Sequence, residues 1–304
     1  MMRTLLTLIN REFWEQRGTF FNVPLILAGI FVLVAIAFFI LSFGQMVDIG
    51  SLQSELANQR VADLIPGAFT AIASPFVLVL WLIVFYYFLG ALYDDRKDGS
   101  VLFWQSMPTS QTQTIVSKLI AGLILAPFCT WVVVMVTQLI ILGIASLFLI
   151  IHPILPWTAL WSAPVILSAW LHIFAVILFQ ALWLLPLFAW CLLCSAFAKK
   201  APALRAVVPI IVLIILEILF FSQHYFTDFV ISRFQYAAEA WRTLSLYGGQ
   251  LISHQGRLSL VNQIKMPFPL DNIKLITMWI GILLSLICYI LAGWFRSRCY
   301  DFER

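Results

Sequence analysis

Six long apolar runs alternate with polar connections along this chain of 304 residues. Each run is long enough to cross a bilayer, for which about 20 residues suffice. The pattern predicts an all-α polytopic membrane protein that forms a single transmembrane domain over residues 1–304. We place its six transmembrane helices at 23–43, 69–92, 113–149, 165–197, 206–222 and 273–295.

Composition supports this class and excludes others. Hydrophobic residues make up 62% of the chain and charged residues only 11%, whereas a soluble protein carries about 25% charged residues. Its mean hydropathy is +0.99. The net charge of +4 is spread over several connections, so we expect no nucleic-acid partner. Cys191 and Cys194 lie within an apolar run, and we interpret them as packing residues and predict no metal site.

Basic residues gather in four segments that would share one side of the membrane. These are the N-terminal segment, the second-to-third connection, the fourth-to-fifth loop and the C-terminal tail, with Arg3, Arg11, Arg17, Arg96, Lys97, Lys118, Lys199, Lys200, Arg205, Arg296, Arg298 and Arg304. Because Lys and Arg are enriched in cytoplasmic loops, both termini are predicted to be cytoplasmic.

The N-terminal segment, residues 1–22, is predicted to be a cytoplasmic amphipathic helix. Its apolar positions recur at helical spacing: Met2, Leu5, Leu6, Ile9 and Phe13. Such a helix would lie along the inner leaflet. It either passes motion into the first span or serves only as an anchor.

The connection at 93–112 carries a short apolar cluster on the predicted cytoplasmic side. Four consecutive residues form the cluster: Val101, Leu102, Phe103 and Trp104. They are too few to cross a membrane, so lipid headgroups or a groove on a partner must cover them. Ser110 and Gln113 match a capping box that would start the third span.

Two strings in the sequence resemble a known family. LYDDRKDGSVLFWQSMPTSQTQTIVSKL, together with REFWEQRGTFF near the N-terminus, is similar to permease subunits of ABC-2 type transporters. The resemblance implies that residues 93–112 form a coupling region that docks onto a separate nucleotide-binding subunit. The residues it assigns to coupling are Arg96, Lys97, Val101, Phe103, Trp104, Met107 and Pro108.

The same resemblance implies the wider assembly. Two permeases, either copies or homologues, would pair with two ATPase subunits in a bacterial inner membrane and export a substrate between the permeases. The motif GxxxxGK[ST] is absent from the sequence, so ATP and Mg²⁺ would bind the partner ATPase. We therefore expect no enzyme activity and no cofactor on this chain itself.

Residues 223–272 and a few polar positions within the spans are candidates for the transport path. The aromatic segment resembles the external or interfacial helices that precede the last span in the family, with Phe229 and Trp241 as gate candidates. A loop packed on the outer leaflet is the alternative. Glu217, Gln138 and Gln180 lie within spans, where polar residues either serve function or join helices by hydrogen bonds.

Other functional classes fit the sequence less well. An intramembrane enzyme would need motifs such as HExxH or GxSxG, which are absent. A secondary transporter or channel usually shows repeats and several charges within its spans. A membrane anchor that regulates an ATPase without transport stays open. The poorly charged spans fit an amphipathic cargo better than an ion, although lipid-facing surfaces have the same composition.

Overall fold

The computed structural model describes residues 2–44, 61–98, 110–151, 160–221, 224–250 and 272–298. Nearly all of these residues are helical, and none of them lies in a strand. The elements are α1 (Met2–Arg17), η1 (Gly18–Asn22), α2 (Val23–Gly44), α4 (Val61–Gly90), α5 (Tyr93–Lys97), α7 (Gln111–Ile120), η2 (Ala121–Leu125), α8 (Ala126–Ile151), α9 (Ala163–Phe197), α10 (Pro202–Phe220), α11 (Tyr225–Gln250) and α12 (Asn272–Arg298).

The described residues contain six helical stretches that are long and apolar enough to cross a membrane. This confirms the prediction of an all-α polytopic membrane protein. The helix ends fall close to the predicted ones, with the largest difference in α4. That helix begins at Val61 instead of residue 69, because it continues through Pro66, which lies outside the predicted span.

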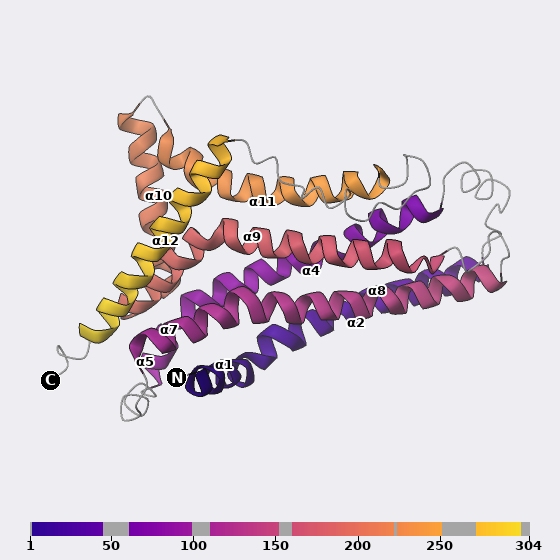
Figure 1. Ribbon diagram of the computed structural model, residues 1–304, viewed down its shortest axis with the longest axis horizontal. Helices are drawn as coiled ribbons and strands as arrows, with labels where there is room; N and C mark the ends of the chain where they lie inside the picture. The colour runs from indigo at the N-terminus through magenta and orange to yellow at the C-terminus, as the bar shows by residue number, and fades with distance from the viewer. Residues whose placement is uncertain are drawn as a thin grey trace.

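The helices form an elongated bundle (Figure 1). Helices α2, α4, α8, α9 and α11 run along its long axis, and α10 and α12 run steeply across it. Helices α1, α5 and α7 lie at the end of the bundle where α12 ends. Helix α9 is central, since it contacts α4, α8, α10, α11 and α12. Described residues of the four basic segments meet at this end: Arg11 and Arg296 lie near Asp95, and Arg96 binds the carbonyl of Ala198 after α9.

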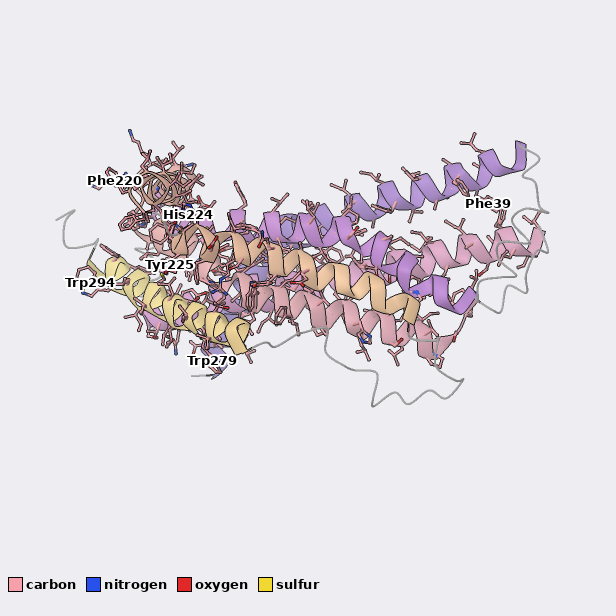
Figure 2. All side chains as sticks on the ribbon, turned by 90° about the horizontal axis from the view of Figure 1, so that it is seen from above. Phe39, Phe220, His224, Tyr225, Trp279 and Trp294 are labelled. Carbon is pink, nitrogen blue, oxygen red and sulfur yellow. The ribbon has the colours of Figure 1, made fainter. Side chains whose placement is uncertain are left out.

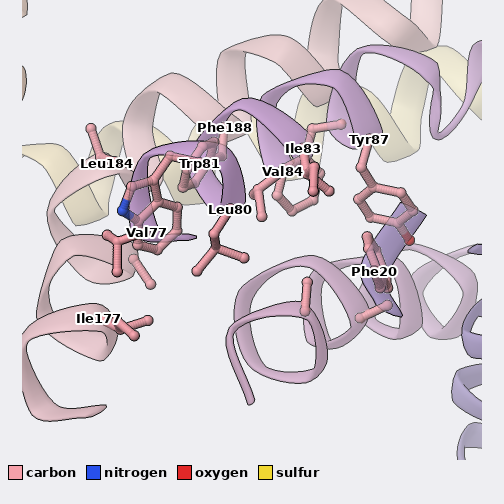
Figure 3. Packing of buried hydrophobic residues seen from close by; sticks show 14 of the residues in the cluster. Phe20, Val77, Leu80, Trp81, Ile83, Val84, Tyr87, Ile177, Leu184 and Phe188 are labelled. Atoms are coloured by element: carbon pink, nitrogen blue, oxygen red, sulfur yellow. The ribbon is translucent and has the colours of Figure 1, made fainter. Parts of the chain in front are cut away.

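Aromatic side chains fill the contact between α4 and α9 (Figure 3). Phe188 of α9 is fully buried, and its ring centroid lies 5.8 Å from Trp81, 4.8 Å from Phe85 and 5.5 Å from Phe88. Between helices in lipid, close packing replaces the hydrophobic effect as the source of association. These rings supply that packing at the centre of the bundle.

By contrast, α10 is exposed around most of its circumference. Ala206 is its one buried residue, and apolar side chains surround the helix up to Phe220 (Figure 2). A helix that is apolar on all faces is suited to hydrocarbon. Its surface is therefore consistent with a membrane-spanning segment.

The N-terminal helix forms as predicted. Leu6 is 62% exposed and Trp14 is 58% exposed, so α1 presents apolar side chains outward, and its place along the inner leaflet stays a prediction. Leu8 and Glu12 are the buried residues among those described in α1. Glu12 faces the bundle because Arg11 and Lys118 lie there as its cationic partners.

The segment before the last span also differs from expectation. We predicted short helices within 223–272, but Tyr225–Gln250 is one helix of 26 residues. It lies beside α4 and α9 (Figure 1). Packing against α4 and α9 stabilises one long helix in place of several short ones, since tertiary contacts outweigh intrinsic propensity.

Candidate functional site: a charged cluster at one end of the bundle

Six charged side chains from four segments meet where α1, α5, α7 and α12 converge. We call them the charged cluster: Arg11, Glu12, Glu15, Asp95, Lys118 and Arg296. Three are basic and three acidic, so the cluster is balanced overall. Balance matters because an unpaired charge is costly to bury.

Glu12 and Lys118 form the centre of the charged cluster. The ammonium of Lys118 lies 3.1 Å from Oε1 and 3.3 Å from Oε2 of Glu12, and the two side chains are 3% and 2% exposed. The hydroxyl of Tyr87 donates to Oε2 over 2.9 Å, and Arg11 lies 3.1 Å from Oε1. This carboxylate therefore joins α1 to both α4 and α7.

Asp95 connects the cluster to the start of the predicted coupling region. Its Oδ1 lies 3.3 Å from Lys118 and 3.8 Å from Arg11, and its Oδ2 lies 3.6 Å from Arg296 of α12. Because these groups are largely buried, removing any one would leave its partners charged without compensation. The cluster thus fixes the positions of the four segments relative to one another.

A second set of contacts holds α5 against the end of α9. The hydroxyl of Ser195 accepts hydrogen bonds from the backbone N–H groups of Leu92 (3.0 Å) and Tyr93 (2.9 Å). Arg96 donates to the carbonyls of Ser195 and, over 3.0 Å, of Ala198. Arg96, one of the residues assigned to coupling, is therefore turned inward onto the α9 end.

The other side of the coupling region begins with the predicted capping box. Ser110 Oγ accepts from the backbone N–H of Gln113 over 3.2 Å, and the Gln113 side chain accepts from the backbone N–H of Ser110 over 3.2 Å. This confirms the predicted start of the third span. Lys97 is exposed. The remaining coupling residues lie outside the described residues: Val101, Phe103, Trp104, Met107 and Pro108.

Gln138 and Gln180, the glutamines proposed for the path, each join three helices. The Gln138 amide donates to the Phe69 carbonyl (2.9 Å) and accepts from Trp170 Nε1 (2.8 Å). Gln180 accepts from Trp81 Nε1 over 2.9 Å and donates to the Ala237 carbonyl over 2.7 Å. Both side chains are buried with their amides paired, an arrangement that suits joining helices.

Glu217 lies near the end of α10, and its carboxylate caps the N-terminus of α11. Its carboxylate accepts from the backbone N–H groups of Phe226 (2.6 Å) and Thr227 (2.7 Å) and from the Thr227 hydroxyl (2.7 Å). A carboxylate is favourable at a helix N-terminus, where N–H groups lack partners. This contact fixes the turn between the two helices.

The candidate path residues do not form one site. Phe229 lies on α11 with its ring against Arg233, and Trp241 also lies on α11, although its side chain is outside the described residues. A cavity of about 380 Å³ opens elsewhere, between α2, α4 and α8, near Phe39 (Figure 2). Its lining is apolar apart from Gln138.

Sequence reasoning did not single out Glu12, Asp95, Arg233 or Arg296 as buried charges. One signal was available for Glu12, which follows Leu5 and Leu8 at helical spacing and so shares their face. A second signal is the position of Arg233 in the middle of an aromatic segment, where a charge is unusual.

Comparisons with protein-family models, with curated proteins and with solved structures gave no match in any of the three cases. The six long apolar helices of the described residues define the chain as a multi-pass α-helical membrane protein.

Proposed function

We propose that this chain is the membrane-spanning subunit of an ATP-driven transporter whose ATPase is a separate polypeptide. In this proposal the ATPase docks on the region 93–112 and its movement is passed to the spans. ATP and Mg²⁺ would bind the ATPase. By the resemblance to ABC-2 permeases, two copies of the chain would pair and the cargo would be exported.

One observation carries the proposal: both ends of the segment 99–109 are fixed to the bundle. Before the segment, Asp95 joins the charged cluster and Arg96 binds the end of α9. After it, the capping box starts α7, which carries Lys118 into the same cluster. A force applied to the segment would therefore reach several helices at once.

The burial of the ion pairs supports a mechanical role. Exposed ion pairs are weak and yield easily, whereas a buried pair resists separation because each ion would be left uncompensated. Glu12 and Lys118 are almost fully buried. Displacement of the coupling region would thus move α1, α7 and α12 together with it.

Site-specific photocrosslinking tests the docking. A benzophenone amino acid at position 103 should crosslink a protein that carries a P-loop when the chain is expressed in its native cells. The matched control places the same group at Trp14, which is 58% exposed at the same end of the bundle. Crosslinks to lipid alone at position 103 would show the proposal to be wrong.

A second experiment separates transport from simple anchoring. In the isolated complex, Phe103→Ala with Trp104→Ala should lower ATPase stimulation and cargo movement while membrane insertion stays normal. Lys199→Ala with Lys200→Ala, at exposed positions of the loop after α9, should leave both activities unchanged. Normal export by the first variant would contradict the coupling assignment, and ATPase binding without cargo movement would indicate an anchor.

A further inference from the structure

Arg233 of α11 is a buried guanidinium surrounded by neutral groups. It is 1% exposed. Its Nη2 donates to the backbone carbonyl of Thr277 over 2.7 Å. Its Cζ lies 4.9 Å from the centroid of the Trp183 ring and 4.3 Å from that of Phe229. Three helices, α9, α11 and α12, thus enclose the cation.

No carboxylate of the described part of the chain forms an ion pair with Arg233. Its Nε is buried and has no hydrogen-bond partner among the residues that the structure describes. A guanidinium has five N–H donors, and a carbonyl with two rings satisfies few of them. Charged residues within transmembrane bundles pair with one another or with backbone carbonyls, and they commonly mark ligand or ion pathways.

Arg233 lies too far from the charged cluster to form an ion pair with its acidic residues. Trp183, which contacts it, lies about 20 Å from the Phe197 end of α9 at 1.5 Å per residue. The cation therefore lies within the length of the bundle, away from the acidic residues of the charged cluster. To reach that end, the guanidinium would have to give up its contacts with Trp183 of α9 and Thr277 of α12.

Gly281 of α12 leaves the space that the guanidinium occupies. A methyl group at Gly281 would lie 3.0 Å from Nη2 and 3.1 Å from Nη1 of Arg233. The planar fork therefore lies directly against the α12 backbone. The Thr277 carbonyl that it contacts is a neutral acceptor, and an anionic oxygen at the same place would form a stronger, charge-assisted bond.

We propose that Arg233 recognises the headgroup of an anionic amphiphile in a site between α9, α11 and α12. The headgroup is a phosphate or carboxylate, which the fork of the guanidinium binds through two parallel hydrogen bonds. The rings of Trp183 and Phe229 keep the cation stacked while the anion replaces the Thr277 carbonyl.

The apolar part of the ligand follows from the surroundings. Ile276 and Ile280, on the flank of α12 next to Thr277 and Gly281, are exposed and apolar, whereas Trp279 lies on the far side of the helix and points away from the bundle (Figure 2). A headgroup that enters past this surface comes from a hydrocarbon phase and brings an apolar chain with it. That this amphiphile is the cargo rests on the proposed function, but the binding site itself does not.

The test uses the full chain alone in dodecyl maltoside, so its result does not depend on any ATPase. Dodecyl phosphate should raise the thermal unfolding temperature in a saturable manner, and dodecyltrimethylammonium, with the same chain and opposite charge, should not. Equal shifts with both would overturn the proposal. An equal shift with inorganic phosphate would contradict the claim that the ligand is an amphiphile and would assign the site to a free anion.

Variants assign the effect to this residue. Arg233→Met should abolish the shift, and Arg233→Lys, which keeps the charge and loses the fork, should weaken half-saturation about 10-fold or more. Gly281→Ala should weaken it too, by displacing the guanidinium. If Arg233→Met fails to fold, the half-saturation concentrations of dodecyl phosphate for Arg233→Lys and Gly281→Ala still test the assignment.

The control is Arg17→Met, because Arg17 also lies over a tryptophan, Trp14, at 5.4 Å but is exposed. It should bind like the wild type. Loss of binding in Arg17→Met with retention in Arg233→Lys and Gly281→Ala would overturn the assignment.

Discussion

The ammonium of Lys118 lies 3.1 Å from the carboxylate of Glu12, and the two residues are separated by 106 positions in the chain. This ion pair joins the N-terminal helix to the start of the third span. It lies beside the predicted coupling region, so its strength bears on both folding and function.

Replacing one member of this pair should be strongly destabilising. Glu12→Gln leaves Lys118 buried with less compensation, and we expect a loss of about 3–5 kcal/mol in the free energy of unfolding. Replacing both residues by Met should recover much of that loss. Glu15→Gln is the control, because Glu15 is 47% exposed and its pair should contribute below about 1 kcal/mol. Equal effects of Glu12→Gln and Glu15→Gln on detergent unfolding would disprove the buried pair.

Ser195→Ala should loosen the junction between α4 and α5. The substitution leaves the backbone N–H groups of Leu92 and Tyr93 without their acceptor, at a cost of about 1–3 kcal/mol. Amide exchange at these two residues should accelerate. Ser168→Ala provides the comparison, since that hydroxyl only donates to the Val165 carbonyl within its own helix. Equal exchange rates of the Leu92 and Tyr93 amides in the two variants would show that Ser195 does not hold this junction.

Two glycines should respond to alanine in opposite ways. A methyl group at Gly122 would lie 2.6 Å from Cζ of Phe88, which is fully buried, so overpacking should cost about 1–3 kcal/mol. At Gly143 such a methyl would meet no described atom within 4 Å outside the local helix backbone, and Gly143→Ala should gain up to about 1 kcal/mol of helix stability. Unfolding temperatures of the two variants measure the difference. A stable Gly122→Ala protein would contradict the packing of η2 on α4.

Glu217→Ala should free the first turn of α11. Exchange protection of the Phe226 and Thr227 amides should fall, because the carboxylate accepts from both. Ser232→Ala, which removes a bond within α11 to the Phe229 carbonyl, should leave those amides protected. If Glu217→Ala changes transport but not exchange at the two amides, the residue acts as a gate instead of a cap.

The spans and the capping box were predictable because their signals are local. Apolar length indicates a transmembrane helix, and Ser110 with Gln113 are neighbours on one turn. The sequence strings also marked 93–112 as a region of interest, although most of its proposed coupling residues lie outside the described residues.

The buried charges were not predictable in the same way. Whether Glu12 faces lipid, water or protein depends on Lys118 and Tyr87, which are distant in the sequence. The length of α11 likewise depends on packing against α9 and on the carboxylate of Glu217. Such features arise from tertiary pairing, which the pattern along one chain does not contain.

Two π-helical segments, η1 at Gly18–Asn22 and η2 at Ala121–Leu125, determine how the side chains of each following span are rotated about its axis relative to the preceding helix. Each lies between a helix of the charged cluster and the span that follows it. One residue more or fewer rotates every later side chain by about 100° around the helix axis. Deleting a single residue from either segment would therefore turn the packing face of the span away from its present direction relative to the ionic residues.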